Sequence, residues 1–127
     1  MTVEEIIAAA TARTGLTKIG DESVLDGLAR LIQAYQTEAR LTPQGLEMKR
    51  ETLVGAMAIR MKVEDWMERH PELLERPIEK PLFVFGLPRT GTTLTINLLA
   101  SDPATRSFLR WEIYDPMPPA QPGELHA

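Results

Sequence analysis

The segment of residues 81–100 constrains the fold of this chain more than any other. An apolar run at residues 81–85 leads into a loop with glycines at positions 86 and 91, and an apolar helical pattern follows at residues 94–100. A strand, a glycine-containing turn and a helix start commonly bind phosphate, because backbone N–H groups and the helix dipole converge on one point. The sequence therefore predicts an anion site at this turn.

The loop can be compared with the nucleotide-binding pattern G-x-x-x-x-G-K-[ST]. Gly86 and Gly91 occupy the two glycine positions, and Thr93 occupies the final hydroxyl position. Thr92 replaces the lysine, and the nearest positive charge is Arg89, inside the loop. The missing lysine argues against ordinary ATP or GTP hydrolysis. A guanidinium, which offers paired N–H donors and keeps its charge, indicates a different anion.

A family resemblance becomes specific at these residues. Residues 81–94, Pro-Leu-Phe-Val-Phe-Gly-Leu-Pro-Arg-Thr-Gly-Thr-Thr-Leu, resemble the 5′-phosphosulfate loop of sulfotransferases that use 3′-phosphoadenosine 5′-phosphosulfate (PAPS). The Pro-Arg-Thr-Gly-Thr-Thr loop is similar to that of the bacterial and tyrosylprotein branch. Residues 70–72, residues 98–103, Arg106, Trp111 and Glu112 also resemble bacterial members. The resemblance covers most of the chain and is strongest over residues 81–119.

The resemblance implies an activity and roles for individual residues. The activity would be transfer of a sulfuryl group from PAPS to a hydroxyl or amine of a small-molecule acceptor. Arg89 would bind the oxygen that bridges phosphate and sulfate, and Glu112 would be the general base. A metal is not obviously needed beside a fixed guanidinium. The residues that would bind the donor are Leu87, Pro88, Arg89, Thr90, Gly91, Thr92 and Thr93.

Composition excludes several other classes of protein. The 127 residues suffice for one modest domain, and the net charge of −4 gives no basic field for nucleic acid. The absence of cysteine excludes disulfides and thiolate metal sites. The N-terminus is acidic where a signal peptide would be basic, and no apolar stretch is long enough to span a bilayer. We expect a soluble, cytoplasmic protein.

The chain divides into three parts by pattern. Residues 1–76 are predicted to be helical, residues 77–114 to form a strand–loop–helix unit, and residues 115–127 to be a proline-rich loop. Thr2 with Glu5, Asp21, and Thr42 before a proline predict three helix starts, and Gly15 predicts the end of the first helix. The third helix should end near residue 70, before a proline, and the helix after the loop should cover residues 92–101.

The predicted strand at residues 82–85 has no convincing neighbour. It is apolar on both faces, as in the middle of a parallel sheet, and only the short run 107–109 could pair with it. A lone buried strand would leave its N–H and C=O groups unpaired. We therefore predict an α/β protein of the P-loop NTPase-like sulfotransferase fold. This chain would be its N-terminal piece, mostly helical with one central parallel strand, completed by a missing C-terminal segment or by a second copy.

Several alternatives stay open. Glu112 could be a surface carboxylate, and Arg106 could either pair with it or contact substrate. The chain could belong to an atypical P-loop kinase or other phosphate-binding enzyme, or it could be a non-catalytic helical interaction remnant that keeps the loop. The 3′-phosphate site of the family has no recognisable counterpart here. We therefore expect this chain to be weak or inactive by itself.

Overall fold

Two of the three helices before residue 70 begin at a threonine whose hydroxyl caps the helix. The computed structural model describes residues 1–119. Helix α1 (Val3–Thr14) begins at Thr2, whose hydroxyl accepts the Glu5 N–H, while the Glu5 carboxylate accepts the Thr2 N–H. It ends at Gly15, where φ is 73° and the left-handed backbone favours glycine. The predicted start and end of this helix are confirmed.

Helices α2 and α3 follow the predicted pattern with one difference. Helix α3 (Pro43–Arg69) begins as predicted, with the Thr42 hydroxyl accepting the Gly45 N–H at 3.1 Å. The residue that precedes helix α2 (Ser23–Thr37) is Glu22, one residue after the predicted Asp21, and the Glu22 side chain makes no capping hydrogen bond. Asp21 instead accepts the Ser23 N–H at 2.9 Å, because its short side chain reaches the amide two residues ahead.

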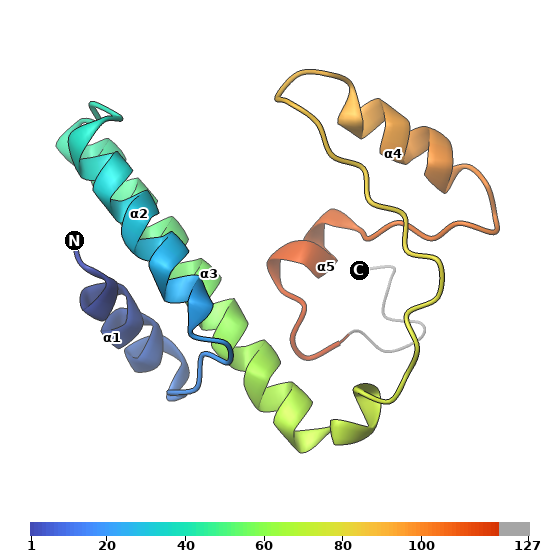
Figure 1. The fold of residues 1–127 in the computed structure, drawn as a ribbon, viewed down its shortest axis with the longest axis horizontal. Helices are drawn as coiled ribbons and strands as arrows, with labels where there is room; N and C mark the ends of the chain where they lie inside the picture. The colour runs from blue at the N-terminus through green and yellow to red at the C-terminus, as the bar shows by residue number, and fades with distance from the viewer. Residues whose placement is uncertain (120–127) are drawn as a thin grey trace.

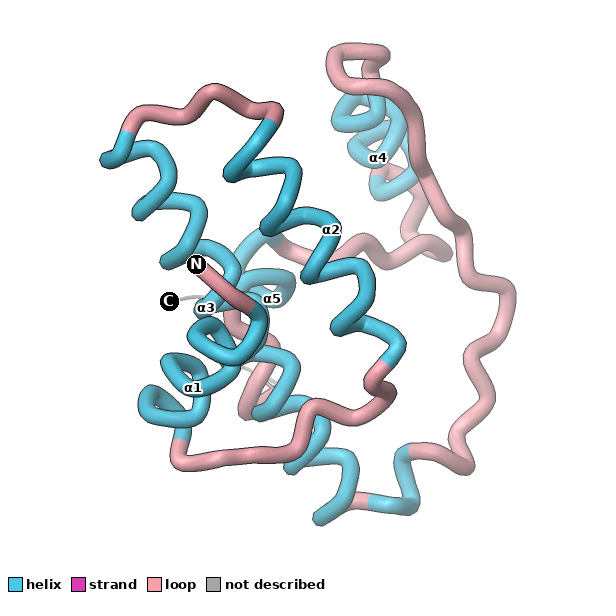
Figure 2. The backbone as a smooth tube through the Cα atoms, turned by 60° about the vertical axis from the view of Figure 1, so that its left-hand side comes forward, coloured by secondary structure: helices cyan, strands magenta, loops and turns pink. Residues whose placement is uncertain are grey.

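The core of the described chain lies between these three helices. Figure 1 shows α2 running alongside α3, with α1 beside them, and Figure 2 shows the same bundle from a second side. The buried side chains are all apolar and come from all three helices. They are Ile6, Ala10, Leu28, Ile32, Leu53, Val54, Met57, Ala58 and Met61. Met57 and Met61, one helical turn apart on α3, both belong to this core.

After α3 the chain leaves the bundle. A short 3₁₀ helix, η1 (Pro71–Leu73), is followed by an extended segment, helix α4 (Thr92–Ala100) and helix α5 (Arg110–Tyr114). Figures 1 and 2 show α4 standing away from the bundle at the far end of the extended segment. Within residues 71–119 no residue is buried. The part that carries the predicted anion loop therefore contributes nothing to the core.

The predicted central strand is not confirmed in the described chain. Residues 82–85 are extended, but no strand is assigned anywhere in residues 1–119. A strand is defined by hydrogen bonds to a neighbour, and neither residues 107–109 nor any other described segment pairs with it. Leu82, Phe83 and Phe85 are 68%, 81% and 90% exposed. Residues 82–85 are therefore extended and apolar as predicted, but within the described chain they are not buried in a sheet.

The described helices also bear on membrane insertion. In residues 1–119 we find no helix that combines the length and the apolar character needed to cross a membrane. Helix α3 is the longest at 27 residues, and charged side chains recur along it. Five of its side chains are buried in the bundle.

The core makes a first prediction about stability. Met61 is fully buried, so Met61→Ala leaves a cavity and should lower the free energy of unfolding by about 2–5 kcal/mol. Met48 lies on the same helix at 66% exposure, so Met48→Ala should change this free energy by no more than about 0.5 kcal/mol. Urea unfolding followed by far-ultraviolet circular dichroism measures both. Equal losses in the two variants would contradict the proposed core.

The start of α1 makes a second prediction, about pH. The Thr2 N–H and the N-terminal ammonium, 3.3 Å from the carboxylate, hold the pKa of Glu5 below its ordinary value of 4.5. A lowered folded pKa gives stability that is present above pH 4.5 and is lost as the pH falls through the folded value. Glu5→Gln should therefore be less stable than the unmodified chain at pH 6. The difference should shrink toward pH 3, as measured by urea unfolding across this range. A constant difference would contradict the assignment.

Candidate functional site

The predicted anion loop is a tight turn between the extended segment and α4. Arg89 and Gly91 both have left-handed backbones, with φ of 68° and 93°. Gly91 is the residue that precedes the first turn of α4, and no side chain caps this helix. Glycine adopts such a φ without cost, whereas arginine does so rarely. The loop therefore turns sharply at two points to bring its backbone to the start of α4.

The backbone N–H groups of this turn are free to bind a ligand. No N–H of residues 89–94 donates a hydrogen bond to another part of the described chain, and the first backbone bond here is from Thr95 N to Gly91 O at 3.0 Å. The first N–H groups of a helix need an outside acceptor and carry partial positive charge. Consecutive free amides in a left-handed turn suit the oxygens of a phosphate or sulfate.

Gly86 closes the loop from the other side. The Thr90 hydroxyl donates to the Leu87 carbonyl at 2.7 Å and folds the loop back over Gly86. A Cβ atom at position 86 would lie 2.8 Å from the Thr90 Oγ1 and 3.3 Å from the Thr92 Cγ2. Glycine is therefore favoured here because a Cβ atom would come too close to the Thr90 side chain. The backbone conformation itself does not call for glycine. The Thr92 and Thr93 hydroxyls make no hydrogen bond within the described chain.

Arg89 is the only charged side chain of the loop. It is exposed, and it takes part in none of the ion pairs found among residues 1–119. Since no carboxylate within that range neutralises it, its positive charge adds to that of the free amides. The turn therefore combines a permanent cation with a set of oriented N–H donors.

The structure does not bring Glu112 to this loop. Glu112 lies on α5, which Figure 1 shows apart from α4 and the loop. One carboxylate oxygen accepts the Leu109 N–H at 2.6 Å, and the other pairs with Arg106. The side chain is only 15% exposed. The pairing of Arg106 with Glu112, one of two alternatives left open by the sequence, is present.

Helix α5 was missed by the sequence analysis. Its signal is Glu112 itself, which lies three residues after Leu109, the residue that precedes the helix. A glutamate at this position commonly accepts the N–H of the residue before the helix. Because α5 has only five residues, its apolar periodicity was too short to detect. The immediate role of Glu112 in the described chain is therefore to hold the start of this helix.

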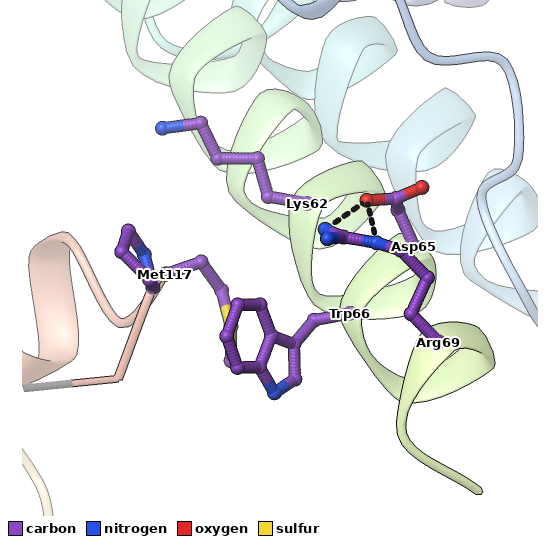
Figure 3. Close-up of a pocket in the computed structure, with 6 residues that line it drawn as sticks. Lys62, Asp65, Trp66, Arg69 and Met117 are labelled. Atoms are coloured by element: carbon purple, nitrogen blue, oxygen red, sulfur yellow. Dashed lines mark hydrogen bonds and ion pairs between the residues drawn. The ribbon is translucent and has the colours of Figure 1, made fainter.

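A second concave site lies at the end of α3 (Figure 3). It is a shallow pocket of about 340 Å³, lined by Lys62, Asp65, Trp66, Arg69, Met117 and Pro118. Asp65 accepts from the Arg69 Nε at 3.0 Å, and the Arg69 guanidinium lies 5.4 Å from the centre of the Trp66 ring. None of the predicted site residues lines this pocket. Within residues 1–119, no three His, Asp or Glu side chains gather as a metal site would require.

Comparisons with known proteins agree with the family resemblance of the loop sequence. The model of the "Sulfotransferase family" matches residues 81–124. A crystal structure of a sulfotransferase from Mycobacterium avium matches with a TM-score of 0.83 and 39% identity, over 94% of this chain and 30% of that one. A sulfotransferase from Mycobacterium tuberculosis matches with a TM-score of 0.82 and 38% identity, over 91% of this chain and 32% of that one. A comparison with curated proteins gave no significant match.

These matches also show how much of the related proteins this chain covers. The chain spans about a third of the length of the two solved structures it resembles. The matched family region includes the whole loop and α4, together with α5 and Glu112. The helical bundle lies before this region and is matched through the solved structures.

The close approach at Gly86 makes a third prediction. Gly86→Ala should displace Thr90 and weaken the binding of inorganic pyrophosphate, because the N–H groups would no longer converge. Amide resonances of residues 86–94 in NMR titrations measure this binding. Gly55→Ala on α3 is the matched control, since a Cβ there meets nothing within 4 Å. A Gly86→Ala variant that binds pyrophosphate as the unmodified chain does would contradict the geometry.

Proposed function

Because the chain belongs to the sulfotransferase family, we propose that it carries the donor-binding loop of an enzyme that moves a sulfuryl group from PAPS to a hydroxyl or amine of a small molecule. The family match over residues 81–124 supports the class of reaction. The observation that carries the choice of donor is the set of free N–H groups at residues 89–94 beside Arg89. PAPS would supply the activated sulfuryl group, and its 5′-phosphate suits this donor set.

Each loop residue has a distinct proposed role. The N–H groups of Thr90, Gly91, Thr92 and Thr93 bind the 5′-phosphate oxygens, and Leu87 and Pro88 shape the turn. The Thr92 and Thr93 hydroxyls have no partner within the described chain and can donate to the same oxygens. The Thr90 hydroxyl already donates to Leu87, so it contributes by holding the loop closed. Gly86 leaves room for the Thr90 side chain in this closed loop, because it has no Cβ atom.

Arg89 stabilises the charge that develops during transfer. The acceptor oxygen or nitrogen attacks sulfur, the bond from sulfur to the bridging phosphate oxygen breaks, and its electron pair stays on that oxygen. Arg89 donates to this oxygen, where negative charge grows. Positioned cations and amides that need no rearrangement are the main source of catalysis in such loose, in-line transfers. The proton of the acceptor passes to a general base.

Glu112 stays our proposal for that base. In the described chain its carboxylate is bound by Arg106 and by the Leu109 N–H. To accept a proton it must exchange the Arg106 contact for the acceptor group. The Arg106 pair and the Leu109 N–H then hold the carboxylate in one orientation until the acceptor binds.

We propose further that this chain is weak or inactive by itself. It spans about a third of its solved relatives, and both faces of its loop segment are exposed. A non-catalytic helical interaction module is the second candidate, because every buried residue among residues 1–119 lies in α1–α3. Nucleotide binding separates the two candidates, because the second needs none.

A fourth prediction tests the donor. Calorimetry should detect binding of 3′-phosphoadenosine 5′-phosphate to the unmodified chain. Arg89→Ala should weaken this binding about 10- to 100-fold, because a hydrogen bond from a charged donor is lost. The matched control is Arg30→Ala, since Arg30 is 80% exposed on α2, a helix that Figure 1 shows apart from α4. Tighter binding of ATP with Mg²⁺ would favour an atypical P-loop kinase instead. Absence of any nucleotide binding would favour the helical interaction module.

A further inference from the structure

Helix α5, which carries Glu112, is too short to hold its own position. It has five residues, and isolated helices shorter than about 12 residues are only marginally stable in water. The contacts of Glu112 with Arg106 and with the Leu109 N–H all lie within residues 106–112. They shape the start of the helix, but they do not attach it to the bundle. The placement of Glu112 relative to the bundle therefore depends on contacts outside this range.

The segment directly after α5 makes such contacts with the last turns of α3. The Asp115 N–H donates to the Trp111 carbonyl at 2.8 Å, where α5 ends, and the Asp115 carboxylate lies 3.7 Å from the Lys62 ammonium. Met117 is half-buried and lines the same pocket as Trp66. Figure 3 shows the Met117 side chain reaching from this segment toward the indole ring. The end of α5 is thus attached to α3 by one apolar contact and one ion pair.

Of these two attachments, the apolar contact at Trp66 is the better built. The Arg69 guanidinium lies 5.4 Å from the centre of the indole ring, and the His70 ring stacks on the indole with 4.4 Å between the ring centres. Both residues belong to the end of α3, so they hold the indole in place independently of the segment after α5. The Lys62 and Asp115 side chains are 45% and 72% exposed, and exposed ion pairs contribute little.

We propose that Trp66 is a positioning residue for Glu112. By holding Met117, it fixes the end of α5 against α3, and with it the carboxylate that lies about one helical turn before that end. The catalytic meaning of this position rests on the proposed role of Glu112 as the general base. A base must come within hydrogen-bond reach of the acceptor, and a displacement of about 1 Å can lower a rate about 100-fold. The bundle therefore acts on the transfer step through α5.

The orientation of α5 can be measured in the whole chain without nucleotide or acceptor. The measurement is the set of NMR residual dipolar couplings of the amides of α5 and α3 in one alignment medium. In the unmodified chain, one alignment tensor should fit both helices. In Trp66→Ala the couplings of α5 should fall about twofold or more relative to those of α3, because α5 would move independently. Trp66→Phe should restore them, since it keeps an aromatic ring and the lost indole N–H has no hydrogen-bond partner within residues 1–119.

Two further variants make the test specific. Met117→Ala should have the same effect as Trp66→Ala, and the double variant should add nothing, because both changes remove one contact. Met117 lies outside the core, so its variant tests the contact without disturbing the bundle. Met48→Ala, at an exposed apolar position on α3, is the matched control and should leave the couplings of α5 unchanged.

Several results would overturn the proposal. They are averaged α5 couplings in the unmodified chain, unchanged couplings in Trp66→Ala or Met117→Ala, additive effects of these two changes, and an equal loss in Trp66→Phe. None of them involves a nucleotide, whereas the proposed function fails on absence of nucleotide binding. The two failures can therefore be distinguished.

Discussion

Burial of apolar side chains between α1, α2 and α3 is the interaction on which the described structure depends. Ile6, Val54 and Met61 are completely buried there, and no residue between 71 and 119 joins them. The ion pairs around this core, such as Arg13 with Glu51 at 2.8 Å, are exposed and add little free energy. The bundle thus provides a stable base from which the loop segment projects.

The sequence predicted the parts of the fold that are decided locally. The cap at Thr2, the glycine end at Gly15 and the Thr42–Pro43 start all depend on residues within a few positions of each other. The central strand is not confirmed, because a strand depends on a partner far away in the sequence and no described segment provides one. The residue directly before α2 is Glu22 and not the predicted Asp21. The two positions are hard to distinguish in the sequence, because an aspartate at either one can accept an N–H from the start of the helix.

The candidate site shows the same division. The glycine spacing predicted a turn with free amides, and the backbone at Arg89, Gly91 and α4 has that form. The role of Glu112 could not be predicted equally well, because a base is defined by its distance from a substrate held by other segments. Its contacts with Arg106 and Leu109 are local, and the sequence had left that pairing open. The pocket at Trp66 was not predicted, because it combines α3 with residues about fifty positions later.

The left-handed backbone of Arg89 has a consequence for how this loop can evolve. A non-glycine residue with a φ of 68° costs about 1–2 kcal/mol of conformational free energy. Glycine at position 89 would remove that cost, and it would also remove the only charge in the loop. Selection for a more stable chain and selection for an anion-binding chain therefore oppose each other at one residue.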